Sequence, residues 1–231
     1  MQEINVQLNF FYMHYNDAKM FAKWAKNRVS DEDANPSIYA RHSIISSVFA
    51  SEALINRILN DFSKDKDVFN TLEKSSILDK WYLAPYLCCD SEPSDKSFKK
   101  GEEPFQSFKE LISIRNWLAH PKVEIYLNAQ LDPNSTFTVG PSEEDYPWLE
   151  MLKGEQWKQT KIPKNPFEID YTHAKASIKI VDAMIEVLKE KLKGQIYEGW
   201  LDEIIVKDIN GLHHYKAPIA TIWGGYGGVK S

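Results

Sequence analysis

The sequence predicts a mainly helical protein. Four segments carry apolar side chains at helical spacing, and they cover residues 10–28, 37–62, 105–119 and 168–193. Hydrophobic residues make up 43% of the 231 positions and aromatic residues 13%, so the chain can build a sizeable core. We therefore expect a mainly all-α fold, an antiparallel helical bundle with an irregular insertion at residues 128–166 and a short β-leaning C-terminal tail.

The first half of the chain divides at its prolines. The helix at residues 10–28 is followed by an acidic loop that ends at Pro36, and Ser37 is expected to cap the second helix, which runs to about Phe62. Residues 64–80 are typical of one or two short helices. Residues 85–103 contain proline, glycine and many polar side chains, which indicates a loop.

In the second half, Pro104 begins a helix that Pro121 stops. Residues 123–127 favour a short strand, and the insertion at 128–166 is expected to be ordered, with a hairpin, because it carries Phe137, Tyr146, Trp148 and Trp157. A further helix ends at Gly194. The tail favours either a short strand pair or a path over the surface. We expect a helical domain at residues 1–194 and a C-terminal extension at 195–231.

The composition limits the classes of function. The net charge of −5 disfavours a broad phosphate-binding surface, so any contact with nucleic acid should be local. The two cysteines, Cys88 and Cys89, are adjacent and lack zinc-binding spacing, and His213–His214 have no convincing partners, so we expect neither metal nor cofactor. The most apolar segment, residues 44–59, is charged and too short to span a bilayer, and no signal peptide is evident. These observations favour a cytoplasmic protein without membrane contact.

Two of the helices carry a charged residue on the side meant for the core. In the second helix, Glu52 falls within the apolar stripe formed by Ile44, Ile45, Val48, Ile55, Leu59 and Phe62. In the helix at 105–119, Arg115 lies near the centre of the stripe formed by Phe105, Phe108, Leu111, Ile112, Leu118 and Ala119. A buried charge without a partner is costly, so we expect Glu52 to pair with Arg115 and orient its guanidinium. A purely structural ion pair fits the same pattern.

The same helix ends at His120, directly before Pro121. Asn116 lies one turn earlier and on the same side, and the long side chain of Arg115 starts from the neighbouring side. A histidine can move a proton near neutral pH, and an arginine can hold a phosphate and stabilise the charge of the transition state. This set of residues suits phosphodiester cleavage without a metal ion.

Residues 113–121, SIRNWLAHP, resemble the signature of HEPN (higher eukaryotes and prokaryotes nucleotide-binding) domains, in which an arginine and a polar residue precede a histidine at a helix end. Residues 51–56 are similar to the acidic second-helix segment of many members. The resemblance covers about residues 10–193, apart from the insertion. It implies a helical bundle that forms a homodimer, with the two motifs facing each other across a cleft. Carried over by position, Arg115 and His120 are catalytic, Asn116 is supporting and Glu52 is orienting.

The resemblance implies an endoribonuclease of toxin–antitoxin or defence systems, with RNA as substrate and an antitoxin protein as partner. Other members of the family have lost activity and bind nucleotides, RNA or protein. The acidic net charge of this chain favours that second interpretation. A purely structural helical domain, in which Glu52 and Arg115 only pair, is the third.

Overall fold

The computed structural model describes residues 5–7, 9–27, 35–62, 66–88, 98–120, 154–192, 204–208 and 211–215. The chain divides into two compact units. The first consists of Met1–Tyr15, Ala50–Ser97 and Leu188–Ser231, and the second of Asn16–Phe49 and Phe98–Val187.

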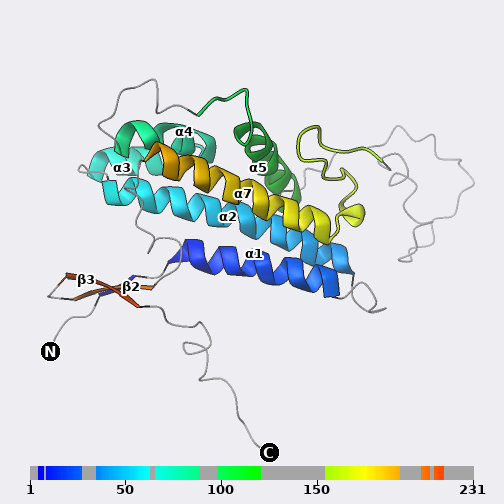
Figure 1. Cartoon of the computed structure of the whole chain (residues 1–231), viewed down its shortest axis with the longest axis horizontal. Coiled ribbons are helices and arrows are strands. Elements are labelled where there is room, and N and C mark those ends of the chain that lie inside the picture. Colours follow the sequence, from blue (N-terminus) through cyan, green and yellow to red (C-terminus); the bar gives the residue numbers. More distant parts are fainter. Residues whose placement is uncertain are drawn as a thin grey trace, which may run out of the picture. The chain divides into compact units, whose positions relative to one another are not determined.

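The described residues are mainly helical, as predicted (Figure 1). The helices are α1 (Phe10–Asn27), α2 (Pro36–Phe62), α3 (Lys66–Glu73), α4 (Ile77–Cys88), α5 (Phe105–Ala119), the 3-10 helix η3 (Pro166–Glu168) and α7 (Tyr171–Lys191). The two short helices expected within residues 64–80 are α3 and the start of α4.

Three helix boundaries differ from the predictions, and one of them is the start of α7, which begins at Tyr171 and not at residue 168. Asn35, and not Ser37, caps α2: its side-chain Oδ1 accepts a hydrogen bond from the Ser37 backbone N–H at 3.0 Å, and Pro36 takes the first helical position. The loop predicted from Pro85 is wrong for the first four residues, because α4 continues through Pro85 to Cys88. Both of these residues are buried, so packing outweighs the hydrogen bond that proline cannot donate.

In the second unit, α1 and α2 lie antiparallel and close together. The Ser43 hydroxyl donates a hydrogen bond to the Ala18 carbonyl oxygen at 2.7 Å, and both residues are fully buried. Six residues further along α1, the rings of Trp24 and Tyr39 meet edge-on at 5.7 Å. Within residues 16–27 of α1 the buried residues are the small Ala18 and Ala25, and several large apolar residues of the helix are exposed. Phe10, Met13, Met20 and Trp24 are 55%, 39%, 37% and 38% exposed.

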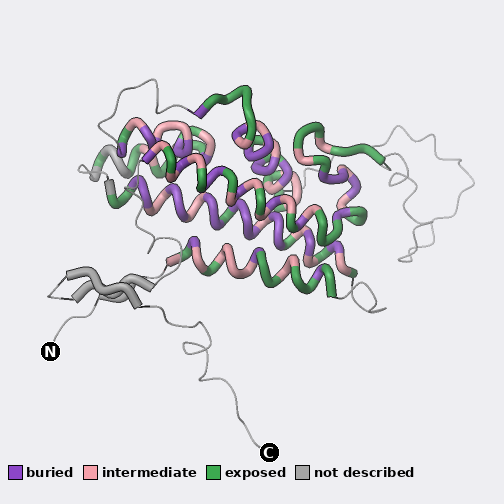
Figure 2. The backbone as a smooth tube through the Cα atoms, in the orientation of Figure 1, coloured by how far each residue is buried: buried purple, intermediate pink, exposed green. Residues whose placement is uncertain are grey.

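Helices α2 and α7 run side by side in the same direction within this unit (Figure 1). Near their starts, Arg41 Nη1 donates to the Pro166 carbonyl oxygen at 2.9 Å. Further along, the hydroxyls of Ser47 and Ser177 lie 3.2 Å apart, and each also donates to a carbonyl of its own helix. Because these buried serines are small, the two helices can approach each other closely. Figure 2 shows buried residues along both helices.

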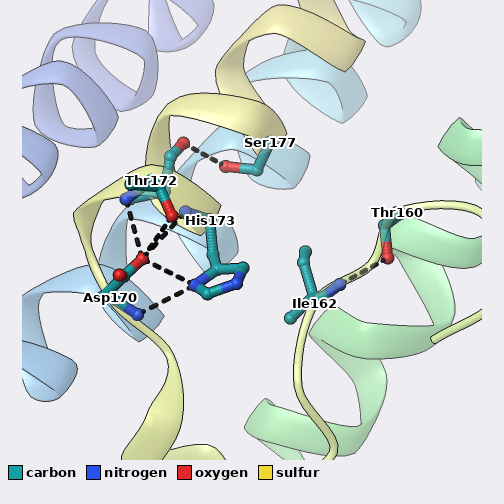
Figure 3. A network of polar contacts seen from close by, with 7 residues as sticks. Thr160, Ile162, Asp170, Thr172, His173 and Ser177 are labelled. Carbon is teal, nitrogen blue, oxygen red and sulfur yellow. Dashed lines mark hydrogen bonds and ion pairs between the residues drawn. The ribbon is translucent and has the colours of Figure 1, made fainter. Parts of the chain in front are cut away.

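The start of α7 is held by Asp170. Its Oδ1 accepts hydrogen bonds from the Thr172 N–H at 2.8 Å and the Thr172 hydroxyl at 2.6 Å, and His173 Nδ1 lies 2.7 Å from the same oxygen (Figure 3). Partial burial by itself would raise the pKa of Asp170. The hydroxyl of Thr172, the charge of His173 and the backbone N–H groups outweigh this effect, so the pKa lies below its ordinary value.

The described end of the insertion folds back on itself and is anchored to α5. Gln156 and Pro163 form an antiparallel bridge, in agreement with the hairpin expected in this insertion. The Glu110 carboxylate accepts hydrogen bonds from the backbone N–H groups of Gln159 at 2.9 Å and Thr160 at 2.6 Å. The ring of Trp157 meets that of Trp117 at 6.4 Å. The strand expected at 123–127 and the aromatic residues Phe137, Tyr146 and Trp148 lie outside the described residues.

The first unit contains a small antiparallel sheet. Its strands are β1 (Asn5–Gln7), β2 (Ile204–Asp208) and β3 (Gly211–Tyr215), in the order β1-β2-β3, with Val6 opposite Val206 and Val206 opposite His213. The β-leaning tail thus forms the strand pair that the sequence favoured. The sequence missed β1, because three residues are too few to show an alternating pattern. None of the described helices is long and apolar enough to cross a membrane.

Candidate functional site

The predicted histidine stands at the end of α5. The helix stops at Ala119, as the following proline predicted, and His120 has non-helical dihedral angles of φ −129° and ψ 66°. Its backbone N–H still donates to the Asn116 carbonyl oxygen at 2.9 Å, which fixes the position of the residue at the helix end. Its side chain is exposed to solvent. The imidazole is therefore accessible to a ligand.

The other two motif residues precede it on the same helix. Asn116 is exposed and lies one turn before His120, so α5 presents an amide and an imidazole on one side. Arg115 points to the neighbouring side, where Leu111 and Ile112 are buried, and is itself half-buried. The structure thus brings the three residues together at one helix end, with the cation partly sheltered from water.

The guanidinium of Arg115 lies over an aromatic ring of α2. Its central carbon is 5.3 Å from the centre of the Phe49 ring, which is a cation–π contact. Phe49 is 37% exposed. This contact was missed in the sequence. The available signal was helical spacing, since Phe49 falls three residues before Glu52, the residue expected to meet Arg115.

Glu52 is half-buried on α2. It belongs to the first compact unit and Arg115 to the second, so their pairing stays a prediction. The apolar stripe around Glu52 is largely as expected: Ile44, Val48, Ile55 and Leu59 are buried, and Ile45 is half-buried.

Phe49 continues an apolar line along the second unit's part of α2. Ile38, His42, Ile45 and Phe49 follow one another at helical spacing. Ile45 is half-buried, and the other three are exposed. We call these four residues the α2 face. At one side it meets α1, where the ring of Phe21 lies 5.4 Å from that of His42. At the other side it meets Arg115 of α5. Exposed apolar surface of this kind, next to a polar site, is typical of contact surfaces.

The described residues contain no group of three His, Cys, Asp or Glu side chains placed to hold a metal ion. Cys88 is buried in α4. Cys89 lies outside the described residues. His213 and His214 lie on β3, where the structure describes the backbone alone.

Comparison with known proteins adds no relative to this picture. No family model matches the chain, and no curated protein and no solved structure matches it. The chemistry of the site therefore has to be argued from its own residues.

Proposed function

We propose that this protein is a metal-independent endoribonuclease of the HEPN type. One observation supports the proposal above all. Helix α5 ends with an exposed imidazole and an exposed amide, while a guanidinium on the adjoining side is held over the ring of Phe49. These groups suit the attack of a ribose 2′-hydroxyl on the neighbouring phosphodiester.

In the proposed reaction, the imidazole of His120 accepts the proton of a ribose 2′-hydroxyl as that oxygen attacks the neighbouring phosphorus. The bond from phosphorus to the 5′-oxygen breaks, and the products are a 2′,3′-cyclic phosphate and a 5′-hydroxyl. Arg115 binds the non-bridging oxygens, where negative charge increases in the transition state. Asn116 orients the phosphate or the imidazole by hydrogen bonding.

The reaction also needs an acid that protonates the departing 5′-oxygen. Each α5 offers one imidazole at this site, so we propose that a second copy of the chain supplies the other. The α2 face supports a homodimer, because three of its four residues are apolar, three are exposed, and it is continuous with Arg115 through Phe49. A copy docked there would bring a second motif toward the first. Glu52 would orient Arg115 in this proposal.

The test is cleavage of RNA in the presence of a chelator, with the ends of the products analysed. We expect 2′,3′-cyclic phosphate ends, and a loss of about 10²–10⁴-fold in rate for His120→Ala. Arg115→Ala should lose about 10²–10³-fold. The matched control is Ser113→Ala, an exposed position on the same helix, which should keep full activity. If purified His120→Ala and Arg115→Ala cleave RNA as fast as the wild type, the proposal is wrong.

A toxin–antitoxin or defence role is part of this proposal. It predicts that expression of the wild-type chain, but not of His120→Ala, slows growth of the host cell. An antitoxin protein that covers the end of α5 would remove this effect.

A second candidate is a non-catalytic module that binds a nucleotide or a protein at the same place. The net charge of −5 favours it, because a chain that handles RNA is usually basic. It predicts binding without turnover. A thermal-shift screen with a panel of nucleotides tests it, and measured RNA cleavage with no shift for any nucleotide would reject it.

A further inference from the structure

A second group of exposed residues lies elsewhere in the same unit, where cations rest on aromatic rings. The guanidinium of Arg41 lies 5.7 Å from the centre of the Phe167 ring, and Lys26 Nζ lies 5.9 Å from that of Tyr171. Phe167 is 51% exposed and Tyr171 36%. Trp24, which is 38% exposed, adds a third open ring. We call these five residues the cation–aromatic cluster.

The residues of the cluster come from the end of α1, the start of α2 and the segment that leads into α7. Trp24 and Lys26 come from the end of α1, and the ring of Trp24 meets Tyr39 at the start of α2. Two residues further on, Arg41 donates to the carbonyl oxygen of Pro166, the residue before Phe167. Tyr171 begins α7 directly after this segment. The end of α1, the start of α2 and the distant segment that leads into α7 therefore place aromatic rings and cations at one end of the unit.

Among the described residues, no carboxylate pairs with the cations of the cluster. Arg41 is half-buried, and its Nη1 binds only neutral oxygens, those of Ser37 at 3.2 Å and Pro166 at 2.9 Å. Within the described part of the chain, neither Arg41 nor Lys26 forms an ion pair with a carboxylate. A guanidinium partly removed from water without a carboxylate gains from an external anion.

The neighbouring carboxylates, those of Glu168 and Asp170, accept hydrogen bonds from residues close to them in sequence. Glu168 accepts a hydrogen bond from the Asn165 amide at 3.2 Å, and Asp170 caps α7. Both are nevertheless exposed, so an extended anionic surface such as a membrane would meet them. A ligand that touches the surface at separate points, through rings and single phosphates, avoids this repulsion.

We propose that the cation–aromatic cluster binds single-stranded RNA, with bases stacked on Phe167, Tyr171 and Trp24 and phosphates held by Arg41 and Lys26. Exposed rings stack on any base, and adjacent cations follow the backbone, which is the arrangement of sequence-tolerant single-strand binding. The inference rests on the proposed ribonuclease function for the identity of the ligand. It adds to that function a surface, separate from the motif, that holds the substrate strand.

The experiment measures binding of a fluorescently labelled single-stranded RNA of about 10 nucleotides. The protein carries His120→Ala, so that binding is measured without cleavage. Adding Phe167→Ala should weaken binding about 10-fold, because one stacked base is lost. The matched control is Phe10→Ala, an aromatic residue that is 55% exposed outside the cluster, and it should bind as the parent does.

A second pair of variants tests the cations. Lys26→Gln should reduce the slope of log binding constant against log salt by about 0.7, because one phosphate contact to a single strand is lost. Lys179→Gln, an exposed lysine of α7 outside the cluster, should leave the slope unchanged.

The two proposals can fail separately. If the chain with an intact His120 cleaves RNA while Phe167→Ala and Lys26→Gln bind it as their controls do, the cluster proposal is overturned and the ribonuclease remains. If no cleavage is found but Phe167→Ala weakens RNA binding and Phe10→Ala does not, the cluster proposal stands and the ribonuclease falls. If the parent binds no single-stranded RNA, the cluster proposal is overturned.

Discussion

The close contact between α1 and α2 at Ser43 makes a quantitative prediction. The Ser43 hydroxyl donates to the Ala18 carbonyl oxygen at 2.7 Å, and both residues are fully buried. Ser43→Ala removes this hydrogen bond but leaves the shape of the contact almost unchanged. We expect it to lower the free energy of unfolding by about 1 kcal/mol.

Ser43→Val tests the narrowness of the contact. Valine loses the same hydrogen bond and adds a branched side chain against the buried backbone of α1, and overpacking of this kind costs about 1–3 kcal/mol. We therefore expect a total loss of about 2–4 kcal/mol. For a chain of this length each kcal/mol corresponds to about 2–4 °C in Tm.

The assay is urea unfolding at 25 °C, followed by far-ultraviolet circular dichroism, with Tm measured in parallel. Ser113 provides the matched control, because its hydroxyl makes a hydrogen bond within its own helix, to the Lys109 carbonyl oxygen at 3.2 Å, but is exposed. Ser113→Val should cost less than about 0.5 kcal/mol, because serine and valine have similar helix propensities. If Ser43→Val is no less stable than Ser113→Val, α1 does not approach α2 as closely as the structure places it.

Three further predictions concern caps and anchors. Because the folded-state pKa of Asp170 is depressed, its contribution to stability is complete above its unfolded pKa of about 3.9 and is lost as the pH falls through the folded value. The loss of stability between pH 5 and pH 2 in urea unfolding should thus be smaller in Asp170→Asn than in the wild type, and an equal loss would contradict the pKa argument. Asn35→Ala removes the cap of α2 and should cost about 1 kcal/mol in the same assay, whereas an unchanged midpoint would show that Pro36 alone suffices. Glu110→Ala should speed hydrogen exchange at the amides of Gln159 and Thr160, measured by mass spectrometry, with Glu155→Ala as an exposed control. Equal exchange in the two variants would mean that the carboxylate does not hold this segment.

Much of the fold could be predicted from local signals. Helical spacing and prolines located the helices, and the stop after Ala119 was correct because a residue before proline avoids helical geometry. The exception at Pro85 has a tertiary cause. Proline disfavours the interior of a helix, but Pro85 is buried in α4, and its packing outweighs this preference. The cap of α2 was placed two residues late, because asparagine and serine are both good caps and spacing alone did not separate them.

The candidate site was predictable only where one helix carries it. Arg115, Asn116 and His120 are close in sequence, so helical geometry was enough to place them at one end of α5. Phe49 could not be found in this way, because its contact with Arg115 depends on how two helices pack. The cation–aromatic cluster could not be predicted from the sequence either, because its contacts also join different elements. Trp24 is exposed while the small Ala18 and Ala25 of the same helix are buried. The apolar pattern of the sequence did not predict this.

The way the insertion is attached has a consequence for how this protein could diversify. The chain leaves α5 at His120 and is back against the same helix at Trp157, Gln159 and Thr160, where Trp117 and Glu110 hold it. The described residues before and after positions 121–153 are therefore held by the same helix, and the entropy of closing a connection between two fixed points grows only slowly with its length. Residues could be added or removed between these points at small thermodynamic cost while the helix end keeps its position. Changes in the number of residues in this connection therefore leave Arg115, Asn116 and His120 in place at the end of α5.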